Sequence, residues 1–311
     1  SLSQEKVNTV RRILLGLEAA GVAEVLVMPD TYAIGERALD GLPLSLRVEA
    51  LAIPVFGDAA DTTRAAAMMA QRGVGCIVTV GGDGTNRAVA KGCGSVPIVA
   101  VSTGTNNVFP TMVEGTLAGM AAGLVATGQV GEEAITPTKR LEVMIDGRAV
   151  DLALVDVVTC RSPFAGARAI WRPDQVEEVV LARAEPGQMG LSAIGAHLLP
   201  LSAADARGLY LRLGEGPLRV RAPIAPGLVA DVSVHSYRPL AQGETVELTP
   251  GPCTVALDGE RELEITGQRL AVRLGRDGPR LVDVQACLRQ AAQQGLWRSG
   301  SAINDGGGQF C

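Results

Sequence analysis

The first 135 residues alternate between apolar spacing typical of helices and apolar spacing typical of buried strands. In residues 3–21, Val7, Val10, Ile13, Leu14 and Leu17 recur at helical spacing, which predicts an amphipathic helix. Short apolar runs predict buried strands at 24–28, 46–53, 75–80 and 97–101. Between them, capping residues and helix formers predict helices at about 31–40, 58–72, 85–91 and 112–127. This order predicts an open, mostly parallel, Rossmann-like sheet with helices on both faces.

Beyond residue 135 the pattern changes to short strands separated by turns rich in Gly and Pro. Asp146-Gly147 between the runs 141–145 and 150–158 is a strong hairpin signal. Further strands are predicted at 209–213, 218–222, 229–234, 245–248, 253–257, 262–265 and 270–274. We therefore predict an all-β sandwich domain at 136–282, after an α/β nucleotide-binding domain at 1–135. Residues 283–311 are predicted to form a helix followed by a Gly-rich tail.

Composition narrows the class of protein. A chain of 311 residues is long enough for two domains. The net charge is −5 and there is no dense Lys/Arg block, which argues against nucleic acid as the main partner. The six cysteines form no C-x-x-C or zinc-type spacing, as expected in a reducing compartment. With no apolar run of transmembrane length and no signal peptide, we expect a cytoplasmic protein without membrane insertion.

The motif that carries chemistry is Gly81-Gly82-Asp83-Gly84-Thr85, which joins a predicted strand to a predicted helix. Ligands of open parallel sheets bind at the carboxyl ends of the strands, where glycines expose N–H groups to anions. The start of the helix adds positive dipole character. An acid among phosphate-binding groups must hold a metal, orient a hydroxyl or accept its proton. The alternative is a plain strand-to-helix turn that Asp83 caps.

A second polar loop, residues 102–110, follows the next predicted strand. Its Gly104, Thr105, Asn106 and Asn107 supply neutral groups suited to phosphate or ribose oxygens. The carboxyl ends of neighbouring strands can converge on one ligand, so we expect both loops to contribute to one site. The alternative is a helix-capping Asx turn.

Gly81-Gly82-Asp83-Gly84-Thr85 resembles the signature of NAD kinases, diacylglycerol kinases and sphingosine kinases. Residues 81–87 and 104–118 are most similar to the NAD kinase-like group that contains acetoin catabolism protein X. The resemblance implies an α/β domain followed by a β domain, and homo-oligomers. It implies Asp83 as the catalytic acid/base or metal-linked group, with Gly81, Gly82, Gly84 and Thr85 cradling the phosphates of ATP.

The chain departs from the family pattern in two places. NAD kinases carry an Asn-Glu pair that holds the dinucleotide, and Val155-Asp156 stands in its place here, so the acid is shortened and the amide is lost. The resemblance makes Asp156 the substrate residue. Family members also open with a strand and a polar loop, whereas this chain opens with a predicted helix. Asp258-Gly259-Glu260 resembles a late motif of the lipid kinases, and a hairpin turn explains it equally well.

The function expected from these residues is phosphoryl transfer from ATP, with Mg²⁺, to a hydroxyl of a small acceptor, and NAD(H) is the first candidate. One alternative is a kinase of a lipid or an acetoin-related acceptor. The other is a nucleotide-binding sensor or structural protein that kept the fold without the chemistry. The absence of a G-x-x-x-x-G-K-[ST] motif excludes a P-loop enzyme.

Overall fold

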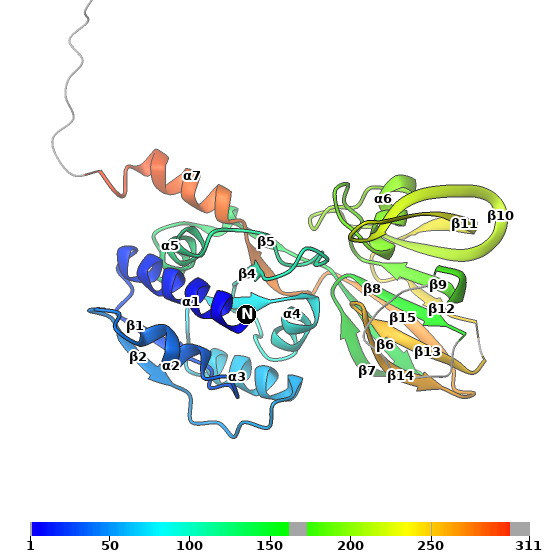
Figure 1. The fold of residues 1–311 in the computed structure, drawn as a ribbon. Helices are drawn as coiled ribbons and strands as arrows, with labels where there is room; N and C mark the ends of the chain where they lie inside the picture. The colour runs from blue at the N-terminus through cyan, green and yellow to red at the C-terminus, as the bar shows by residue number, and fades with distance from the viewer. Residues whose placement is uncertain (1, 162–172, 250, 299–311) are drawn as a thin grey trace, which may run out of the picture.

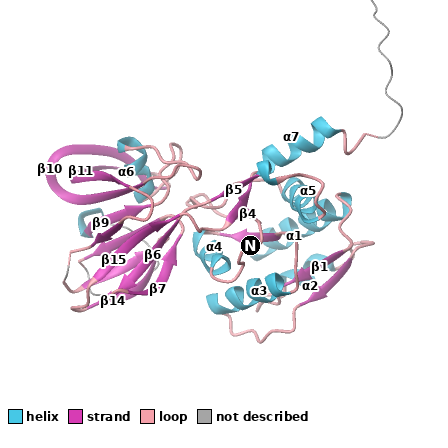
Figure 2. Ribbon diagram, turned by 180° about the vertical axis from the view of Figure 1, so that it is seen from behind, coloured by secondary structure: helices cyan, strands magenta, loops and turns pink. Residues whose placement is uncertain are grey.

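The computed structural model describes residues 2–161, 173–249 and 251–298, arranged as two lobes (Figure 1). The predicted Gly-rich tail lies outside these residues from position 299 on. The first lobe contains parallel strands and helices, and the second is built largely of antiparallel strands, which confirms the predicted fold class (Figure 2). None of the described helices is long and apolar enough to cross a lipid bilayer.

The first lobe has two separate sets of strands. In one, β1 (Glu24–Val27) pairs in parallel with β2 (Arg47–Ala50). In the other, β3 (Ile77–Gly81) pairs in parallel with β4 (Ile98–Ser102), and β4 pairs in parallel with the late strand β16 (Arg280–Val282). Strand β5 (Ile135–Pro137) closes the second set in the antiparallel direction.

Helices pack around these strands in two groups. One group consists of α1 (Leu2–Ala19), α2 (Ile34–Leu39), α5 (Gly115–Ala126) and α7 (Val284–Gln294), with α1 contacting α2 and α5, and α5 contacting α7. The other group is α3 (Ala59–Gln71) with α4 (Asp83–Ala90). Carboxylates begin several of the helices: Asp58 accepts the amide of Asp61, and Asp283 accepts that of Ala286.

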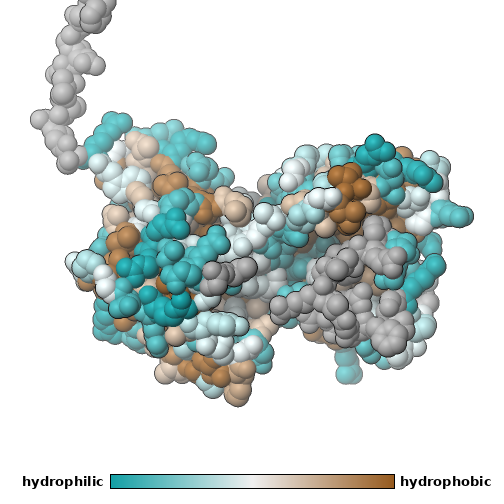
Figure 3. Space-filling view, viewed as in Figure 1, coloured by the Kyte–Doolittle hydropathy of each residue, from teal (hydrophilic) through white to brown (hydrophobic). Residues whose placement is uncertain are grey.

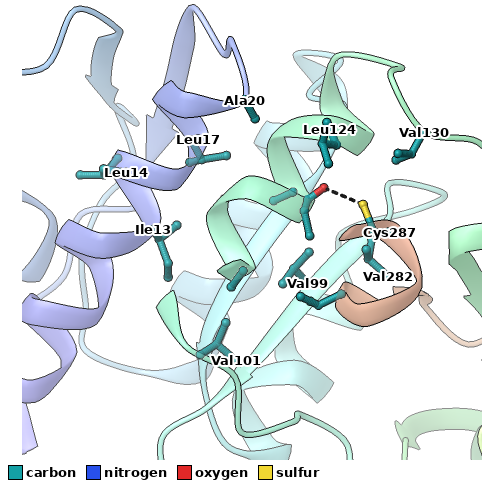
Figure 4. Close-up of a cluster of buried hydrophobic side chains, with 14 of the residues drawn as sticks. Ile13, Leu14, Leu17, Ala20, Val99, Val101, Leu124, Val130, Val282 and Cys287 are labelled. Carbon is teal, nitrogen blue, oxygen red and sulfur yellow. Dashed lines mark hydrogen bonds between the residues drawn. The ribbon is translucent and has the colours of Figure 1, made fainter. Parts of the chain in front are cut away.

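Small residues let α1 and α5 approach closely. A Cβ on Gly119 would lie 2.1 Å from the carbonyl oxygen of Ile13, so only glycine fits at this crossing. Figure 4 shows the core that results, with apolar side chains of α1, α5, β4 and α7 packed together. The thiol of Cys287 in α7 contacts the carbonyl oxygen of Ala121 in α5 at 3.5 Å.

The second lobe is a sandwich of two sheets. Its six-stranded sheet has the order β11-β10-β9-β8-β13-β14 and its four-stranded sheet the order β12-β15-β6-β7. Leu141 and Val143 of one sheet share a core with Val157 and Val255 of the other. The strands are β6 (Arg140–Ile145), β7 (Arg148–Ala153), β8 (Asp156–Cys160), β9 (Val176–Leu181), β10 (Gly208–Ala225), β11 (Leu228–Leu240), β12 (Thr245–Glu247), β13 (Cys253–Leu257), β14 (Glu260–Ile265) and β15 (Leu270–Gly275).

Several predicted elements differ from the structure. The run 150–158, predicted as one strand, divides at Leu154 and Val155 into β7 and β8, which belong to different sheets. The runs predicted at 209–213 and 218–222 form one strand, β10, with an irregular register. Strand β9 and helix α6 (Leu191–Leu198) were not predicted.

The end of the chain returns to the first lobe. Strand β16 joins the first-lobe sheet at Arg280, within the range 136–282 that we expected to be the β domain. Helix α7 then packs against α5. The sandwich is therefore inserted between β5 and β16, which pair with each other in the antiparallel direction.

The α1–α5 crossing yields a stability prediction. Because Gly119→Ala places a methyl group against the backbone of Ile13, we expect the free energy of unfolding to fall by about 1–3 kcal/mol. Leu117→Ala, at a position 37% exposed on the same helix, is the control and is expected to stay within about 0.5 kcal/mol. Urea unfolding followed by circular dichroism measures both. Equal effects of the two substitutions would show that the helices do not cross at Gly119.

Candidate functional site

The two polar loops lie side by side at the carboxyl ends of β3 and β4. Gly81, the last residue of β3, is in register with Ser102, the last residue of β4. Helix α4 begins directly after Gly82, and no side chain caps its first turn by a hydrogen bond. Its first amide groups therefore have no helical acceptor and point beyond the end of the sheet.

The carboxylate of Asp83 binds the second loop. Its two oxygens accept the amide of Val108 at 3.1 and 3.0 Å, and Oδ1 also accepts the amide of Phe109 at 2.7 Å. Asp83 is thus the first residue of α4, and its side chain does not cap that helix. The alternative in which Asp83 only caps a strand-to-helix turn is therefore not what the structure shows. The three bonds fix the carboxylate at the end of the sheet, toward the second lobe.

The same two loop residues are bound from the second lobe. The guanidinium of Arg183, which follows β9, donates to the carbonyl of Phe109 at 3.1 Å and lies over its ring at 5.4 Å. Gln188 donates to the carbonyl of Val108 at 3.4 Å. The amides of this dipeptide therefore bind the first lobe and its carbonyls bind the second, so it joins the two lobes at the site.

A second buried carboxylate organises the facing side of the site. Asp258, in the turn between β13 and β14, accepts the amides of Leu154, Val155 and Asp156 at 2.8–3.2 Å. These bonds lie where the chain passes from β7 to β8, and they explain why the predicted strand divides there. Asp258 has a φ of 51° and Gly259 a φ of 80°, so the hairpin turn that the sequence indicated is also present.

The carboxyl groups of Asp83, Asp156 and Asp258 all have raised pKa values, and the charge of Asp83 contributes to the other two. Burial, opposed by the two loop amides and Arg183, raises the pKa of Asp83 to about 6. Burial and the charge of Asp83 raise the pKa of Asp258 to about 7. Burial, Asp258 and Asp83 raise the pKa of Asp156 well above its ordinary value. Its Oδ1 is buried and has no hydrogen-bond partner, which is uncommon for a buried polar atom.

Basic residues balance this charge at the edge of the site. Arg87 of α4 is buried and lies 3.4 Å from Asp151, 3.9 Å from Asp258 and 3.6 Å from Glu260. Lys91, directly after the end of α4, contacts Asp151 at 2.6 Å. These ion pairs cross from the first lobe to the second and keep α4 against the β13–β14 turn.

The glycines of the motif make room for polar side chains. A Cβ on Gly82 would lie 2.7 Å from the amide oxygen of Asn107, and a Cβ on Gly84 would lie 2.7 Å from a carboxylate oxygen of Glu260. Asn107 also donates to the Ser102 hydroxyl at 2.8 Å and to the carbonyl of Gly104 at 3.3 Å, which shapes the second loop.

The remaining predicted site residues lie around this centre. Thr85 packs against Gly81, on the side of the motif that faces β3. Thr105 and Asn106 are exposed at the tip of the second loop. The structure therefore brings Asp83, Gly82, Gly84, Asn107 and Asp156 together, and leaves Thr105 and Asn106 at the rim.

Sequence reasoning missed Arg183 and gave Asp258 no assigned role. Arg183 follows a strand that was not predicted, and no motif surrounds it. Asp258 was noted only within Asp258-Gly259-Glu260, where a hairpin turn explained it equally well. The buried position of both side chains at the junction of the lobes is the signal that identifies them.

Among the described residues, no group of three or more Asp, Glu, His or Cys side chains is arranged to hold a metal ion by itself. Mg²⁺ commonly binds through one or two carboxylates together with substrate phosphates.

Two family models match consecutive parts of the chain, and a relative that shares one of their names matches most of its length. Residues 2–130 match the model of the ATP-NAD kinase N-terminal domain, and residues 139–277 match that of the acetoin catabolism protein X C-terminal domain. Acetoin catabolism protein X of Cupriavidus necator is 41% identical over 313 residues, which cover 95% of this chain and 87% of the relative.

Similar solved structures have low sequence identity to this chain. Yeast NADH kinase complexed with NADH superposes with a TM-score of 0.55 and 14% identity, over 95% of this chain and 86% of that one. An NAD kinase from Archaeoglobus fulgidus in complex with ATP gives a TM-score of 0.41 and 15% identity, over 87% of this chain and 97% of that one.

The buried carboxylates yield a pH-dependent prediction. The pKa of Asp156 is higher in the folded chain than in the unfolded chain, so the unfolded state binds fewer protons at neutral pH. Asp156 therefore lowers the free energy of unfolding as the pH rises above about 4. Because asparagine does not ionise, Asp156→Asn removes this decrease in the free energy of unfolding. We expect the variant to gain stability relative to wild type between pH 4 and 8, as measured by urea unfolding across that range.

Asp231→Asn is the matched control, because Asp231 is paired with Arg221, which lowers the pKa of its carboxyl group. Its removal should give no such gain. A stability difference between Asp156→Asn and wild type that is the same at pH 4 and 8 would contradict the assigned burial of Asp156.

Proposed function

We propose, from the premise that this chain belongs to the acetoin catabolism protein X family and has the NAD kinase fold, that it is an ATP-dependent kinase of a small hydroxyl-bearing acceptor. The single observation that carries the proposal is the fixed, half-buried carboxylate of Asp83 beside the uncapped start of α4. A carboxylate with a raised pKa next to unpaired amides suits proton removal beside a bound phosphate.

The ATP phosphates would bind at the start of α4. Gly82 and Gly84 supply backbone amides there without side chains of their own, and the helix dipole favours negative charge. Thr85 and Gly81 hold the turn. The side-chain amide of Asn107 would lie next to the phosphates, because it is close to Gly82. Gly104, Thr105 and Asn106 would form the rim of the site around the nucleotide. The surface between the two lobes is hollowed in Figure 3, which leaves room for such a ligand.

The acceptor would lie between Asp83 and Asp156. In the proposed step, Asp83 takes the proton of the acceptor hydroxyl. The hydroxyl oxygen of the acceptor attacks the γ-phosphorus of ATP, and the bond between that phosphorus and the leaving oxygen of ADP breaks. Asp156 would bind the acceptor through its unpartnered Oδ1. Bound Mg²⁺ would neutralise phosphate charge, and Arg183 adds positive charge beside Asp83.

NAD(H) is the first acceptor to test. The fold is shared with an NADH kinase, and Asp156 stands in place of an acidic residue that holds the dinucleotide in the family. A panel of NAD, NADH, diacylglycerol and acetoin with radiolabelled ATP separates the candidates. Label transferred only to NAD(H) supports the proposal, and label transferred to none of the four while ATP binds by calorimetry favours a sensor.

Asp83→Asn should lower kcat/KM for the labelled acceptor by about 10²–10⁴-fold. The amide oxygen of asparagine can still accept the amides of Val108 and Phe109, so the loop and the Kd for ATP should change little. Steady-state kinetics and isothermal calorimetry measure the two effects separately. The exposed Asp231→Asn serves as the control for loss of a carboxylate elsewhere. Near-normal turnover by Asp83→Asn would remove Asp83 from the mechanism.

The pH dependence of the reaction follows from the same carboxylate. Only ionised Asp83 can accept a proton, and its pKa is about 6. We therefore expect kcat/KM to fall on the acid side with a midpoint near this value, and to be constant above it until another group titrates. A pH–rate profile from 5 to 8 measures it. An acid limb centred near pH 4 would show that Asp83 is not the buried base.

A further inference from the structure

Arg183 leaves the second lobe from a backbone that is fixed on both sides. It follows β9, and the amide of its neighbour Ala182 donates to the carbonyl of Val155 at 2.8 Å. Its other neighbour, Ala184, exchanges two backbone hydrogen bonds with Leu201, at 3.0 and 2.8 Å. Because the residues before and after Arg183 are held in this way, its side chain starts from a defined position in the second lobe.

The guanidinium group of Arg183 ends on the residue that orients Asp83. Its Nη1 donates to the carbonyl of Phe109 at 3.1 Å, and its central carbon lies 5.4 Å from the centroid of the Phe109 ring. The amide of the same residue donates to Oδ1 of Asp83 at 2.7 Å, the shortest of the three bonds to this carboxylate. Phe109 therefore links the guanidinium of one lobe to the carboxylate of the other, and a displacement of Arg183 would displace the donor that orients Asp83.

The hydrogen bond to Phe109 does not by itself explain a charged residue here. Arg183 is only 6% exposed, and its Nε is buried without a hydrogen-bond partner among the described residues. Taking a guanidinium out of water is costly, and a donor without an acceptor adds to this cost. A neutral side chain can bond a carbonyl of the same loop, as Gln188 does for Val108 at 3.4 Å. The positive charge of Arg183 therefore has a further role.

Charged groups from three parts of the second lobe influence Asp83 or are influenced by it. Arg183 follows β9, Asp156 begins β8, and Asp258 and Glu260 lie where β13 turns into β14. Burial raises the pKa of Asp83, the two loop amides and Arg183 lower it, and the charge of Glu260 raises it, which leaves a pKa of about 6. Arg183 is thus a cation that favours the ionised form of Asp83 amid carboxylates that oppose it.

The buried arginine of the first lobe serves a different carboxylate. Arg87 of α4 lies 3.9 Å from Asp258 and lowers the pKa of that residue. The two buried arginines at the junction are therefore divided between two carboxylates, Arg87 with Asp258 and Arg183 with Asp83. Without the charge of Arg183, a larger fraction of Asp83 would hold a proton near pH 7 and could not accept another.

We propose that Arg183 is a positioning residue for Asp83: it fixes the direction of the carboxylate through Phe109, and its positive charge keeps that carboxylate ionised at neutral pH. This inference rests on the proposed function, in which Asp83 accepts the proton of the acceptor hydroxyl. Arg183 acts through Asp83 and needs no contact with ATP or with the acceptor. Glu185 limits the effect, because its carboxylate lies 3.1 Å from Arg183 and offsets part of the charge.

The ionisation of Asp83 can be followed in the full chain without any substrate. With carbon-13 at the side-chain carboxyl of aspartate, the NMR resonance of Asp83 is the one that Asp83→Asn removes, and its titration midpoint is read between pH 4 and 9. Arg183→Gln should move this midpoint upward by about 0.5–1 pH unit, because a neutral amide no longer favours the charged carboxylate. Arg183→Lys keeps a positive charge and should stay within about 0.3 pH unit of wild type.

Two further variants separate charge from packing. Glu185→Gln can still accept a hydrogen bond from Arg183 but no longer offsets its charge, so the midpoint should move downward by about 0.3–0.5 pH unit. Gln188→Ala removes the donor to the carbonyl of Val108 without changing a charge, and the midpoint should not move. Shifts of opposite sign from Arg183→Gln and Glu185→Gln are not expected from a loosened loop.

Steady-state kinetics give a second readout. In Arg183→Gln, kcat for the labelled acceptor should fall by about ten-fold, because Asp83 is both displaced and more often protonated. The KM for ATP should change by less than about two-fold, since Arg183 does not contact the proposed phosphate site. The acid limb of the pH–rate profile should move together with the NMR midpoint.

An unchanged midpoint in Arg183→Gln would overturn the proposal. So would a shift of the same size in Arg183→Lys or in Gln188→Ala, which would assign the effect to packing. If Arg183→Gln does not fold, Glu185→Gln decides, and a midpoint that does not fall in that variant contradicts the role of the charge. Absence of phosphoryl transfer to every acceptor would remove the proposed function but leave all the midpoints measurable, so the two failures can be told apart.

Discussion

The carboxylate of Asp83 and the two amides that it accepts hold the candidate site together. A half-buried carboxylate must find donors, and Val108 and Phe109 supply them from the neighbouring strand end. The same dipeptide offers its carbonyls to Arg183 and Gln188 of the other lobe. One short segment thus sets both the direction of the Asp83 side chain and the position of the sandwich relative to it.

The connection between the lobes reinforces this arrangement. The chain leaves the first lobe after β5 and returns through β16, and these two strands pair with each other. Just beyond them, the Thr138 hydroxyl donates to the carbonyl of Pro279 at 2.6 Å, and the Gly278 amide donates to the carbonyl of Thr138 at 3.2 Å. Because both linkers are bonded to each other, they restrain relative motion of the lobes more than a single covalent linker would. Asp258 adds a further link, because it accepts the amide of Asp156 at the start of β8 and lies 3.9 Å from Arg87 of α4.

Concentrating three carboxylates at this junction has an energetic consequence. Burial raises the pKa of Asp83, Asp156 and Asp258, and the charge of Asp83 raises the pKa of the other two further, while Arg183 lowers the pKa of Asp83 and Arg87 lowers that of Asp258. Such an arrangement costs stability at neutral pH, which is typical of sites built for chemistry or binding and not for folding alone. Gly82 and Gly84 also serve the site, because the absence of their side chains allows Asn107 and Glu260 to approach closely.

The sequence by itself determined the α/β lobe, the β-rich lobe and the motif at the end of β3, because periodicity and turn residues are local properties of the chain. It also pointed to Asp83 and to the second loop. It could not determine that 150–158 would divide between two sheets, that β16 would return to the first lobe, or that Arg183 and Asp258 would face Asp83. Those outcomes depend on contacts between residues distant in sequence: the amides of residues 154–156 bond to a carboxylate about one hundred positions later. Only the packed tertiary structure brings such partners together, and with them the buried charges that shift one another's pKa.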